Sequence, residues 1–230
     1  NITADTWDAW KNGYLRVNRQ FAQAIAQRVK DQNRPVIVFP QDYQLYMVPR
    51  FLREDLGAEV YIQPFIHIPW PSHDTWSILP KEMRNDLLYS LLDANRIGFQ
   101  TRKDAFNFVQ TCRYFLPDVE SRGFRDRLFI DSRVVQATAY PISIDIEQVR
   151  SLMKETETQL LKSQLINFVS DRQLILRVDR IEPSKNVLRG LKAYRTLLES
   201  HPEHHGKIQM LCLLVPSRME VEEYKDYMQE

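Results

Sequence analysis

Arg177-Val178-Asp179-Arg180-Ile181-Glu182-Pro183-Ser184-Lys185-Asn186 is a charged decapeptide between two apolar segments. Residues 173–176 before it form a short apolar run, which predicts a buried strand. Apolar residues recur at helical spacing from 186 to 200 and predict a helix after it. The decapeptide is therefore predicted to be a strand-to-helix turn. In an open α/β sheet such turns line the crevice outside the carboxyl ends of the strands, where ligands bind.

Two cations lie in this turn, Arg180 and Lys185. Fixed cations beside a helix N-terminus form an anion site, and a diphosphate suits it. The alternative is a solvated loop in which Asp179, Arg180, Glu182 and Lys185 pair with one another. Taken alone, the segment slightly favours this second interpretation.

Composition limits the classes of protein that fit. The 230 residues are 43% apolar, which suffices for one large or two modest domains. The net charge of +1 gives no basic field for nucleic acid. Two cysteines without metal-ligand spacing indicate thiols of a reducing compartment, so we expect a cytoplasmic protein. No apolar stretch approaches the length of a membrane span. Because the chain opens with Asn1 and stops inside a helical pattern, we expect a segment that lacks both ends of its protein.

Further polar residues follow other predicted strands. Asp42 follows an apolar run at 35–40, His67 follows one at 60–66, and Arg218 follows one at 208–215. Asp42 fits an N-cap and an acceptor of sugar hydroxyls equally well. His67 precedes a stiff loop with two prolines, which favours a binding role over a structural one. Arg218 alone favours an exposed first-turn residue. Together with Arg180 and Lys185, these residues favour one shared ligand crevice.

Strands alternate with helices along the whole chain, which predicts α/β folding with mainly parallel sheets. Further strands are predicted at 96–100, 128–130 and 134–137. Residues 140–145 change direction, and we place a domain boundary there. The predicted helices cover 5–32, a segment ending near 55, 81–94, 101–115, 146–167, 186–200 and a last one from about 219.

Six short motifs succeed one another in a fixed order. They are Gln41-Asp42-Tyr43-Gln44-Leu45 with Pro49-Arg50, His67-Ile68-Pro69-Trp70-Pro71, Ile97-Gly98-Phe99-Gln100-Thr101, Tyr140-Pro141-Ile142-Ser143-Ile144-Asp145, the turn from Asp179 to Asn186, and Val215-Pro216-Ser217-Arg218. In order and spacing they resemble the trehalose-6-phosphate synthase family, glycosyltransferase family 20. The resemblance covers essentially the whole chain.

The resemblance implies a GT-B arrangement, in which two Rossmann-like domains face each other across a cleft. Residues 1–143 would be the C-terminal part of the N-terminal, acceptor-side domain, and 144–230 the first part of the C-terminal, nucleotide-sugar-binding domain. The implied enzyme is a retaining glucosyltransferase that moves glucose from a nucleotide sugar, usually UDP-glucose, to glucose 6-phosphate, giving trehalose 6-phosphate. It needs no metal and no cofactor, and the leaving phosphate takes the acceptor's proton.

The resemblance also implies roles for individual residues. Arg180 and Lys185 match the basic pair on the donor diphosphate, and His67 matches a histidine that contacts the donor sugar, so these three are the expected catalytic and donor-binding residues. Asp42 matches an aspartate that binds acceptor hydroxyls, and Arg218 an arginine on the acceptor phosphate. Preorganised cations suit a reaction whose leaving group gains negative charge. The expected partners are a nucleotide sugar and a sugar phosphate, without nucleic acid or membrane; a homo-oligomer is left open.

Three departures from the family pattern favour a divergent bacterial branch. Gln41 stands where His is common, Trp70 where Phe is usual, and 181–186 differ from Asp-Tyr-Ser-Lys-Gly. One alternative is therefore the same fold with another acceptor, as in glucosylglycerol-phosphate synthases or cyclitol pseudo-glycosyltransferases. Another is a catalytically silent module that binds sugar phosphates, against which the retained basic pair argues.

Overall fold

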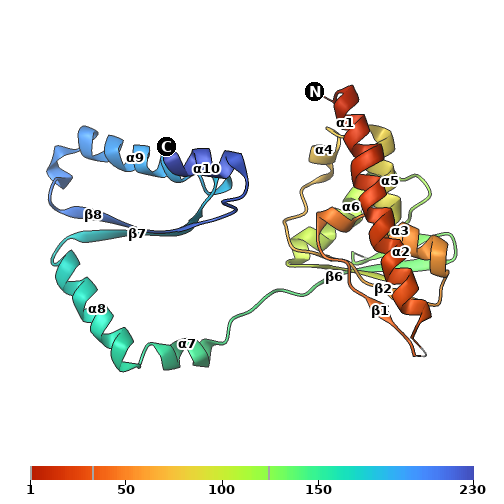
Figure 1. Cartoon of the computed structure of the whole chain (residues 1–230), viewed down its shortest axis with the longest axis horizontal. Coiled ribbons are helices and arrows are strands. Elements are labelled where there is room, and N and C mark those ends of the chain that lie inside the picture. Colours follow the sequence, from red (N-terminus) through yellow and green to blue (C-terminus); the bar gives the residue numbers. More distant parts are fainter. Residues whose placement is uncertain (1, 33, 124) are drawn as a thin grey trace. The chain divides into compact units, whose positions relative to one another are not determined.

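A computed structural model gives the structure of residues 2–32, 34–123 and 125–230. The chain divides into two compact units, unit 1 up to Ser143 and unit 2 from Ile144 to Glu230. Each unit combines helices with parallel strands (Figure 1). The predicted α/β class is therefore confirmed.

Unit 1 alternates strands and helices as predicted. Its helices are α1 (Ala4–Asp8), the π-helical η1 (Ala9–Leu15), α2 (Arg16–Lys30), the 3-10 turn η2 (Tyr43–Leu45), α3 (Val48–Leu56), α4 (His73–Trp76), α5 (Lys81–Leu92) and α6 (Arg102–Phe115). Its strands are β1 (Ile37–Val38), β2 (Tyr61–Ile62), β3 (Phe65–Ile66), β4 (Arg96–Phe99), β5 (Arg127–Ile130) and β6 (Arg133–Ala139).

The strands of unit 1 bring the ends of β1 and β3 together. β1 pairs with β2, and a four-stranded sheet has the order β3-β4-β6-β5, with β5 antiparallel to β6 and the other pairs parallel. The predicted strand at 60–66 is split, because Pro64 has no N–H to donate. A parallel bridge joins Gln41 to Phe65, and the Asp42 N–H donates to the Phe65 carbonyl at 2.8 Å. Asp42 and His67 consequently leave the sheet side by side.

The first predicted helix is continuous but not uniform. A π-helical segment, η1, separates α1 from α2, and the helix ends at Lys30 rather than at 32. π-helical turns are rare and often occur near functional sites. This one carries Tyr14, which contacts the loop after Asp42.

The core of unit 1 lies between its sheet and helices. Strands β2, β3 and β4 contribute fully buried aliphatic and aromatic side chains, and helices α3, α5 and α6 cover them with others: Leu52, Ile62, Ile66, Leu88, Leu91, Ile97, Phe99 and Phe108. Burying each such side chain contributes about 1.5–3 kcal/mol. The sheet is therefore a rigid base for the residues at its carboxyl edge.

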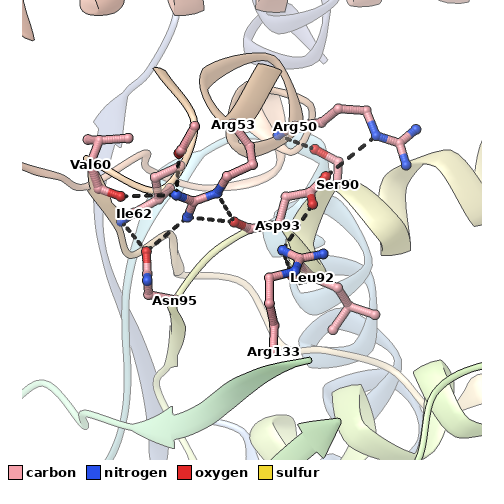
Figure 2. Close-up of polar contacts among 10 residues, drawn as sticks. Arg50, Arg53, Val60, Ile62, Ser90, Leu92, Asp93, Asn95 and Arg133 are labelled. Atoms are coloured by element: carbon pink, nitrogen blue, oxygen red, sulfur yellow. Dashed lines mark hydrogen bonds and ion pairs between the residues drawn. The ribbon is translucent and has the colours of Figure 1, made fainter. Parts of the chain in front are cut away.

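A polar network fastens the amino edge of this sheet (Figure 2). The Arg53 guanidinium donates to the carbonyls of Gly57, Val60 and Asp93 and to Asn95 Oδ1. Asn95 Oδ1 also accepts from a backbone N–H of β2 at 2.8 Å. Because Asn95 directly precedes β4, the network lies at the end of the strands opposite to Asp42 and His67.

Asp93 extends this network to two further arginines. Its carboxylate lies 3.1 Å from Arg133 Nη1 and 3.6 Å from Arg50 Nε. The three arginines thus connect α3, the end of α5 and the start of β6. Figure 2 shows the guanidinium groups of Arg53 and Arg133 beside Asp93, with the end of the Arg50 side chain turned away from them.

Unit 2 is built on one parallel pair of strands, β7 (Gln173–Ile181) and β8 (Ile208–Pro216) (Figure 1). Its helices are α7 (Ile146–Leu152), α8 (Thr156–Val169), the 3-10 turns η3 (Pro183–Lys185) and η4 (Pro202–His204), α9 (Val187–Ser200) and α10 (Glu222–Gln229). Among the helices of the described residues, none has the length and apolar character that crossing a membrane requires.

Two boundary predictions in unit 2 were wrong. The first half of the charged decapeptide is strand, because β7 pairs with β8 in unbroken register as far as Ile181 and Pro216. The predicted helix at 146–167 is two helices, since Glu155 adopts an extended conformation. The side chain of Gln159 donates to the Met153 carbonyl. This carbonyl is one of the acceptors that the end of α7 leaves without a partner inside the helix.

Candidate functional site

Glu182 lies at the centre of the charged turn in unit 2. Its side chain is only 7% exposed, although it directly follows the end of β7. The Ser184 hydroxyl donates to Glu182 Oε1 at 2.6 Å. Arg180 Nη2 lies 3.6 Å from the same oxygen, and Lys185 Nζ lies 3.9 Å from it. The internal ion pairs considered from the sequence therefore exist, and they share one buried carboxylate.

The surroundings of Glu182 keep it ionised. The Ser184 hydrogen bond lowers the pKa of Glu182 most, and the positive charges of Arg180, Lys185 and Arg218 lower it further. One negative and three positive charges leave a net positive cluster at the ends of β7 and β8. The arginine and lysine side chains at 180 and 185 are 56% and 39% exposed. A ligand from solvent can therefore reach them.

Arg177 holds this turn from within. Its guanidinium donates to the Lys185 carbonyl and lies 3.2 Å from the Asp179 carboxylate. Arg177 and Asp179 project from the same face of β7, because side chains alternate along a strand. The guanidinium lies directly against Gly190 in α9. Arg177 is thus a support for the backbone that carries Lys185.

The first turn of α9 is already capped by a side chain. The Tyr227 hydroxyl, from α10, accepts from the N–H groups of Val187 at 2.8 Å and Leu188 at 3.4 Å. Asn186 precedes the helix with a left-handed φ of 55°, a conformation that Asn tolerates better than most residues. The sequence predicted that the free helix N-terminus would assist anion binding. Tyr227 occupies two of the helix N-terminal donors, so the side chains of Arg180 and Lys185 would supply most of the attraction for an anion.

Arg218 follows β8 and joins the same cluster. Its Nη1 donates to the Tyr224 hydroxyl at 2.8 Å, and its guanidinium carbon lies 5.4 Å from the centre of that ring. The backbone of Arg218 has a left-handed φ of 50°. Tyr224 therefore fixes the direction of this cation, while its charge acts on Glu182.

In unit 1, Asp42 adopts a strained backbone conformation. Its φ of 64° and ψ of −177° lie in a region that is almost confined to glycine and that costs about 1–3 kcal/mol. The side chain makes no capping hydrogen bond to the following 3-10 turn, so of the two alternatives left open from the sequence the N-cap is the one that the structure contradicts. Instead, Asp42 Oδ1 accepts from the His67 N–H at 3.2 Å.

His67 is held on three sides. Its backbone binds Asp42, and its Nε2 lies 2.8 Å from Gln41 Oε1. Its ring lies against Phe65, with ring centres 4.8 Å apart. Phe65 in turn lies across Gly98, where a Cβ would meet the Phe65 ring at 2.6 Å. The glycine in β4 therefore makes room for the aromatic support of His67.

The long N-terminal helix positions the loop after Asp42. The Tyr14 hydroxyl donates to the Tyr43 carbonyl at 2.6 Å and accepts from the Tyr46 N–H at 3.1 Å. Fully buried Asn18 donates to the Gln44 carbonyl and accepts from the Met47 N–H, at 3.0 and 3.1 Å. These bonds fix both sides of the turn η2.

Trp70, one of the three departures from the family pattern, belongs to the core. It is 2% exposed, stacks on Trp76 with ring centres 4.5 Å apart, and packs edge-on against Phe108. Its indole N–H donates to the Thr111 hydroxyl at 3.1 Å. The larger ring is thus accommodated by packing and by one hydroxyl, away from ligand-accessible surface.

The predicted site residues form two groups. Asp42 and His67 lie together in unit 1, and Arg180, Lys185 and Arg218 surround Glu182 in unit 2. Sequence reasoning missed Arg177 and Gln41 as partners of these residues, and it treated Glu182 as part of a solvated loop although its side chain is buried. The position of Glu182 between Arg180 and Lys185 in the sequence was the signal that could have indicated a carboxylate shared by both cations. Among the described residues, no cluster of His, Cys, Asp and Glu could hold a metal ion.

A protein-family model matches almost the whole chain. Residues 2–230 match glycosyltransferase family 20. A UDP-forming α,α-trehalose-phosphate synthase of Aspergillus fumigatus is 34% identical over 228 residues, covering 98% of this chain and 42% of the relative. Another, from Pichia angusta, is 35% identical over 226 residues, covering 94% and 45%. The chain spans less than half the length of these relatives.

Solved structures have the same fold. An Escherichia coli structure, described as trehalose-6-phosphate bound with UDP-2-fluoro glucose, has a TM-score of 0.78 at 28% identity and is matched over 100% of this chain and 48% of its own. A UDP-forming α,α-trehalose-phosphate synthase from Burkholderia xenovorans, in complex with glucose-6-phosphate, has a TM-score of 0.72 at 26% identity, with coverages of 95% and 48%. These likenesses confirm the predicted GT-B fold class.

Proposed function

The chain belongs to glycosyltransferase family 20, and from this premise we propose that its protein moves glucose, with retention of configuration, from UDP-glucose to glucose 6-phosphate, giving trehalose 6-phosphate. The cation cluster around Glu182 is the observation that carries the proposal. Relatives named as UDP-forming synthases support the choice of UDP as the nucleotide.

Arg180 and Lys185 bind the donor diphosphate in this proposal. Their nitrogens lie 3.6 and 3.9 Å from Glu182 Oε1. Charge-assisted N–H···O bonds are shorter, about 2.7–2.9 Å. The two cations are thus held near the carboxylate by charge while their hydrogen-bond donors stay free for a ligand. As the nucleoside diphosphate departs, its oxygens gain negative charge, and these preorganised cations stabilise the transition state more than the ground state.

Asp42 and Arg218 bind the acceptor. The Asp42 carboxylate accepts from sugar hydroxyls, with one oxygen held by the His67 N–H. Arg218, fixed by Tyr224, binds the phosphate of glucose 6-phosphate. The charge of Arg218 lowers the pKa of Glu182, as those of Arg180 and Lys185 do, which supports a proposal in which one charge cluster serves both phosphates. We propose that unit 1 belongs to the acceptor-side domain and unit 2 to the nucleotide-sugar-binding domain, from which Arg218 also contributes to acceptor binding.

The proposal is tested with the full-length protein. It is incubated with UDP-, GDP- or ADP-glucose and glucose 6-phosphate, and products are identified by mass spectrometry and by ³¹P NMR. We expect a disaccharide phosphate, formed fastest with UDP-glucose. Failure to form this product with any of the three donors would contradict the proposal.

A different acceptor is the second candidate, and Gln41 favours it. Gln41 is exposed beside Asp42 and His67, so it can change what the acceptor side recognises. Trp70, which also motivated this candidate, is buried and gives it no support. A panel of glucose 6-phosphate, glycerol 3-phosphate and cyclitol phosphates, with UDP-glucose as donor, separates the two. Exclusive use of glucose 6-phosphate would eliminate the alternative.

We further propose that the protein works in the cytoplasm, and that its partners are limited to its substrates and further copies of the chain. Cys112 and Cys212 are both free thiols, and Cys112 is buried, which supports a reducing compartment.

A further inference from the structure

The side-chain amide of Gln41 has a defined orientation. Its Nε2 lies 2.9 Å from the Phe39 carbonyl oxygen, and its Oε1 lies 2.8 Å from His67 Nε2. The reversed amide would set Oε1 against a carbonyl, two acceptors facing each other. The NH₂ group of Gln41 must therefore face Phe39, and the oxygen must face His67.

This orientation determines the tautomer of His67. Gln41 Oε1 can only accept, so His67 Nε2 must carry the hydrogen. In the neutral imidazole the other nitrogen, Nδ1, is then an acceptor without a hydrogen. His67 is exposed, and within the described parts of the chain no polar partner is recorded for Nδ1.

The ring is also fixed in place. Asp42 Oδ1 binds the backbone N–H of His67 at 3.2 Å, and the Phe65 ring supports the imidazole. Nδ1 is thus a preformed acceptor beside the strained Asp42 residue, which has a φ of 64°. An acceptor of this kind binds a hydroxyl group and repels a phosphate oxygen.

We propose that Gln41 is a positioning residue that holds His67 as the Nε2–H tautomer, so that Nδ1 accepts a hydrogen bond from a hydroxyl group of the donor sugar. The second half of this statement rests on the function proposed above, because it requires a sugar nucleotide. The first half does not, because it concerns only the proton on His67. The structure thereby separates two kinds of recognition: His67 takes a sugar hydroxyl, and the cations of unit 2 take phosphate.

The amide of Gln41 meets both requirements because it carries a donor and an acceptor, and two substitutes of similar shape do not. Glutamate has the same shape but no donor for the Phe39 carbonyl, and its negative charge draws a second proton onto the imidazole. Methionine has similar length but offers neither a strong donor nor a strong acceptor. Gln41→Glu and Gln41→Met therefore change the proton on His67 with little change in shape. Gln23→Glu on the exposed face of α2 is the matched control.

The first test is ring-¹⁵N NMR of the full-length protein labelled at histidine, with His67→Gln to assign the signals. We expect one protonated ring nitrogen, Nε2, in the wild-type protein and in Gln23→Glu. We expect a doubly protonated ring in Gln41→Glu and mixed tautomers in Gln41→Met. A wild-type His67 protonated at Nδ1, or one unaffected by both Gln41 variants, would overturn the proposal, whatever the enzyme transfers.

The second test uses UDP-glucose analogues in which one hydroxyl is replaced by hydrogen or by fluorine. Fluorine can accept weakly but cannot donate. At the position that contacts Nδ1, we expect both replacements to weaken binding to a similar extent, with Kd from calorimetry raised about tenfold, the value of one hydrogen bond. In Gln41→Glu, where Nδ1 carries hydrogen, the fluorine analogue should become the better of the two. A wild-type enzyme that prefers fluorine over hydrogen at every position would refute acceptance by Nδ1.

Discussion

Gly190 lies so close to the Arg177 guanidinium that a Cβ at position 190 would stand 2.1 Å from Nη1. Glycine is a poorer helix former than alanine by roughly 1 kcal/mol, so helix propensity alone would favour alanine at position 190. Because position 190 has no Cβ, the Arg177 guanidinium has room to donate its hydrogen bond to the Lys185 carbonyl. The glycine in α9 therefore supports the position of a cation five residues earlier in the chain.

The first prediction concerns Gly190→Ala. The guanidinium ends a flexible side chain and can move aside, so we expect the stability to fall by only about 1 kcal/mol. The turn that carries Lys185 loses its support, and KM for the nucleotide sugar should rise several-fold. Enzyme kinetics and urea unfolding of the full-length protein measure the two effects.

A double-mutant cycle checks the cause. If Gly190→Ala acts by displacing Arg177, it should add little to the KM of an Arg177→Ala protein. Gly13→Ala, where a Cβ meets nothing within 4 Å, is the control and should leave KM unchanged. Fully additive effects of the 177 and 190 substitutions would show that the glycine matters for another reason.

The second prediction concerns the pH dependence of stability. The pKa of Glu182 is lowered in the folded protein, by Ser184 first and then by the cations. Its contribution is therefore present above the unfolded-state pKa of about 4.3 and is lost as pH falls through the folded-state pKa. We expect Glu182→Gln to be less stable than wild type at neutral pH, with a difference that shrinks in acid.

Urea unfolding of both proteins at neutral and acid pH measures this difference. Glu223→Gln, an exposed residue of α10, is the control and should match wild type at both pH values. If the stability gap between wild type and Glu182→Gln were the same at both pH values, the ionised state of Glu182 would not be what stabilises the turn.

The third prediction concerns catalysis by Lys185. Its ammonium is partly exposed and 3.9 Å from its carboxylate partner, so Lys185→Ala should leave the unfolding midpoint nearly unchanged. It should lower kcat/KM for the nucleotide sugar by about 10²–10³-fold, as loss of one preorganised charge contact does. Lys192→Ala, an exposed lysine of α9, should have wild-type kinetics. Unchanged turnover in Lys185→Ala would remove that residue from the site.

The fourth prediction concerns the network at the amino edge of the unit 1 sheet. Arg53→Met removes the donors to the carbonyls of Gly57, Val60 and Asp93. The bonds to the Val60 and Asp93 carbonyls are partly buried, and acceptors left without a partner there are costly, so we expect a loss of about 1–3 kcal/mol in urea unfolding. Arg28→Met on the surface of α2 should cost far less. Equal stabilities of the two variants would show that the network in Figure 2 is not a structural support.

The order of strands and helices could be predicted because hydrophobic periodicity is local information. The helix predicted at 101–115 begins where expected, because the Thr101 side chain caps it by accepting from the Asp104 N–H. The predicted boundaries were wrong where a pairing partner far away in the sequence determines the end of a strand. β7 continues through the charged residues up to Ile181 because β8 supplies a partner for each of them.

The site was predictable as a set of residue types but not as an arrangement. Arg180, Lys185, His67, Asp42 and Arg218 were proposed because each follows a strand predicted from the sequence, although Arg180 in fact lies near the end of β7. The partners Arg177 and Gln41 and the burial of Glu182 were not predicted, because packing between elements determines them. The role of the Gln41 amide could not be predicted either, because it depends on a contact with a histidine 26 residues away in the sequence.

The most direct measurement is a crystal structure of the full-length protein with bound UDP-glucose. The account predicts diphosphate oxygens within hydrogen-bond distance of the Arg180 guanidinium and the Lys185 ammonium, with Glu182 still beneath both cations. A diphosphate bound elsewhere, with these two side chains turned away from it, would contradict the account.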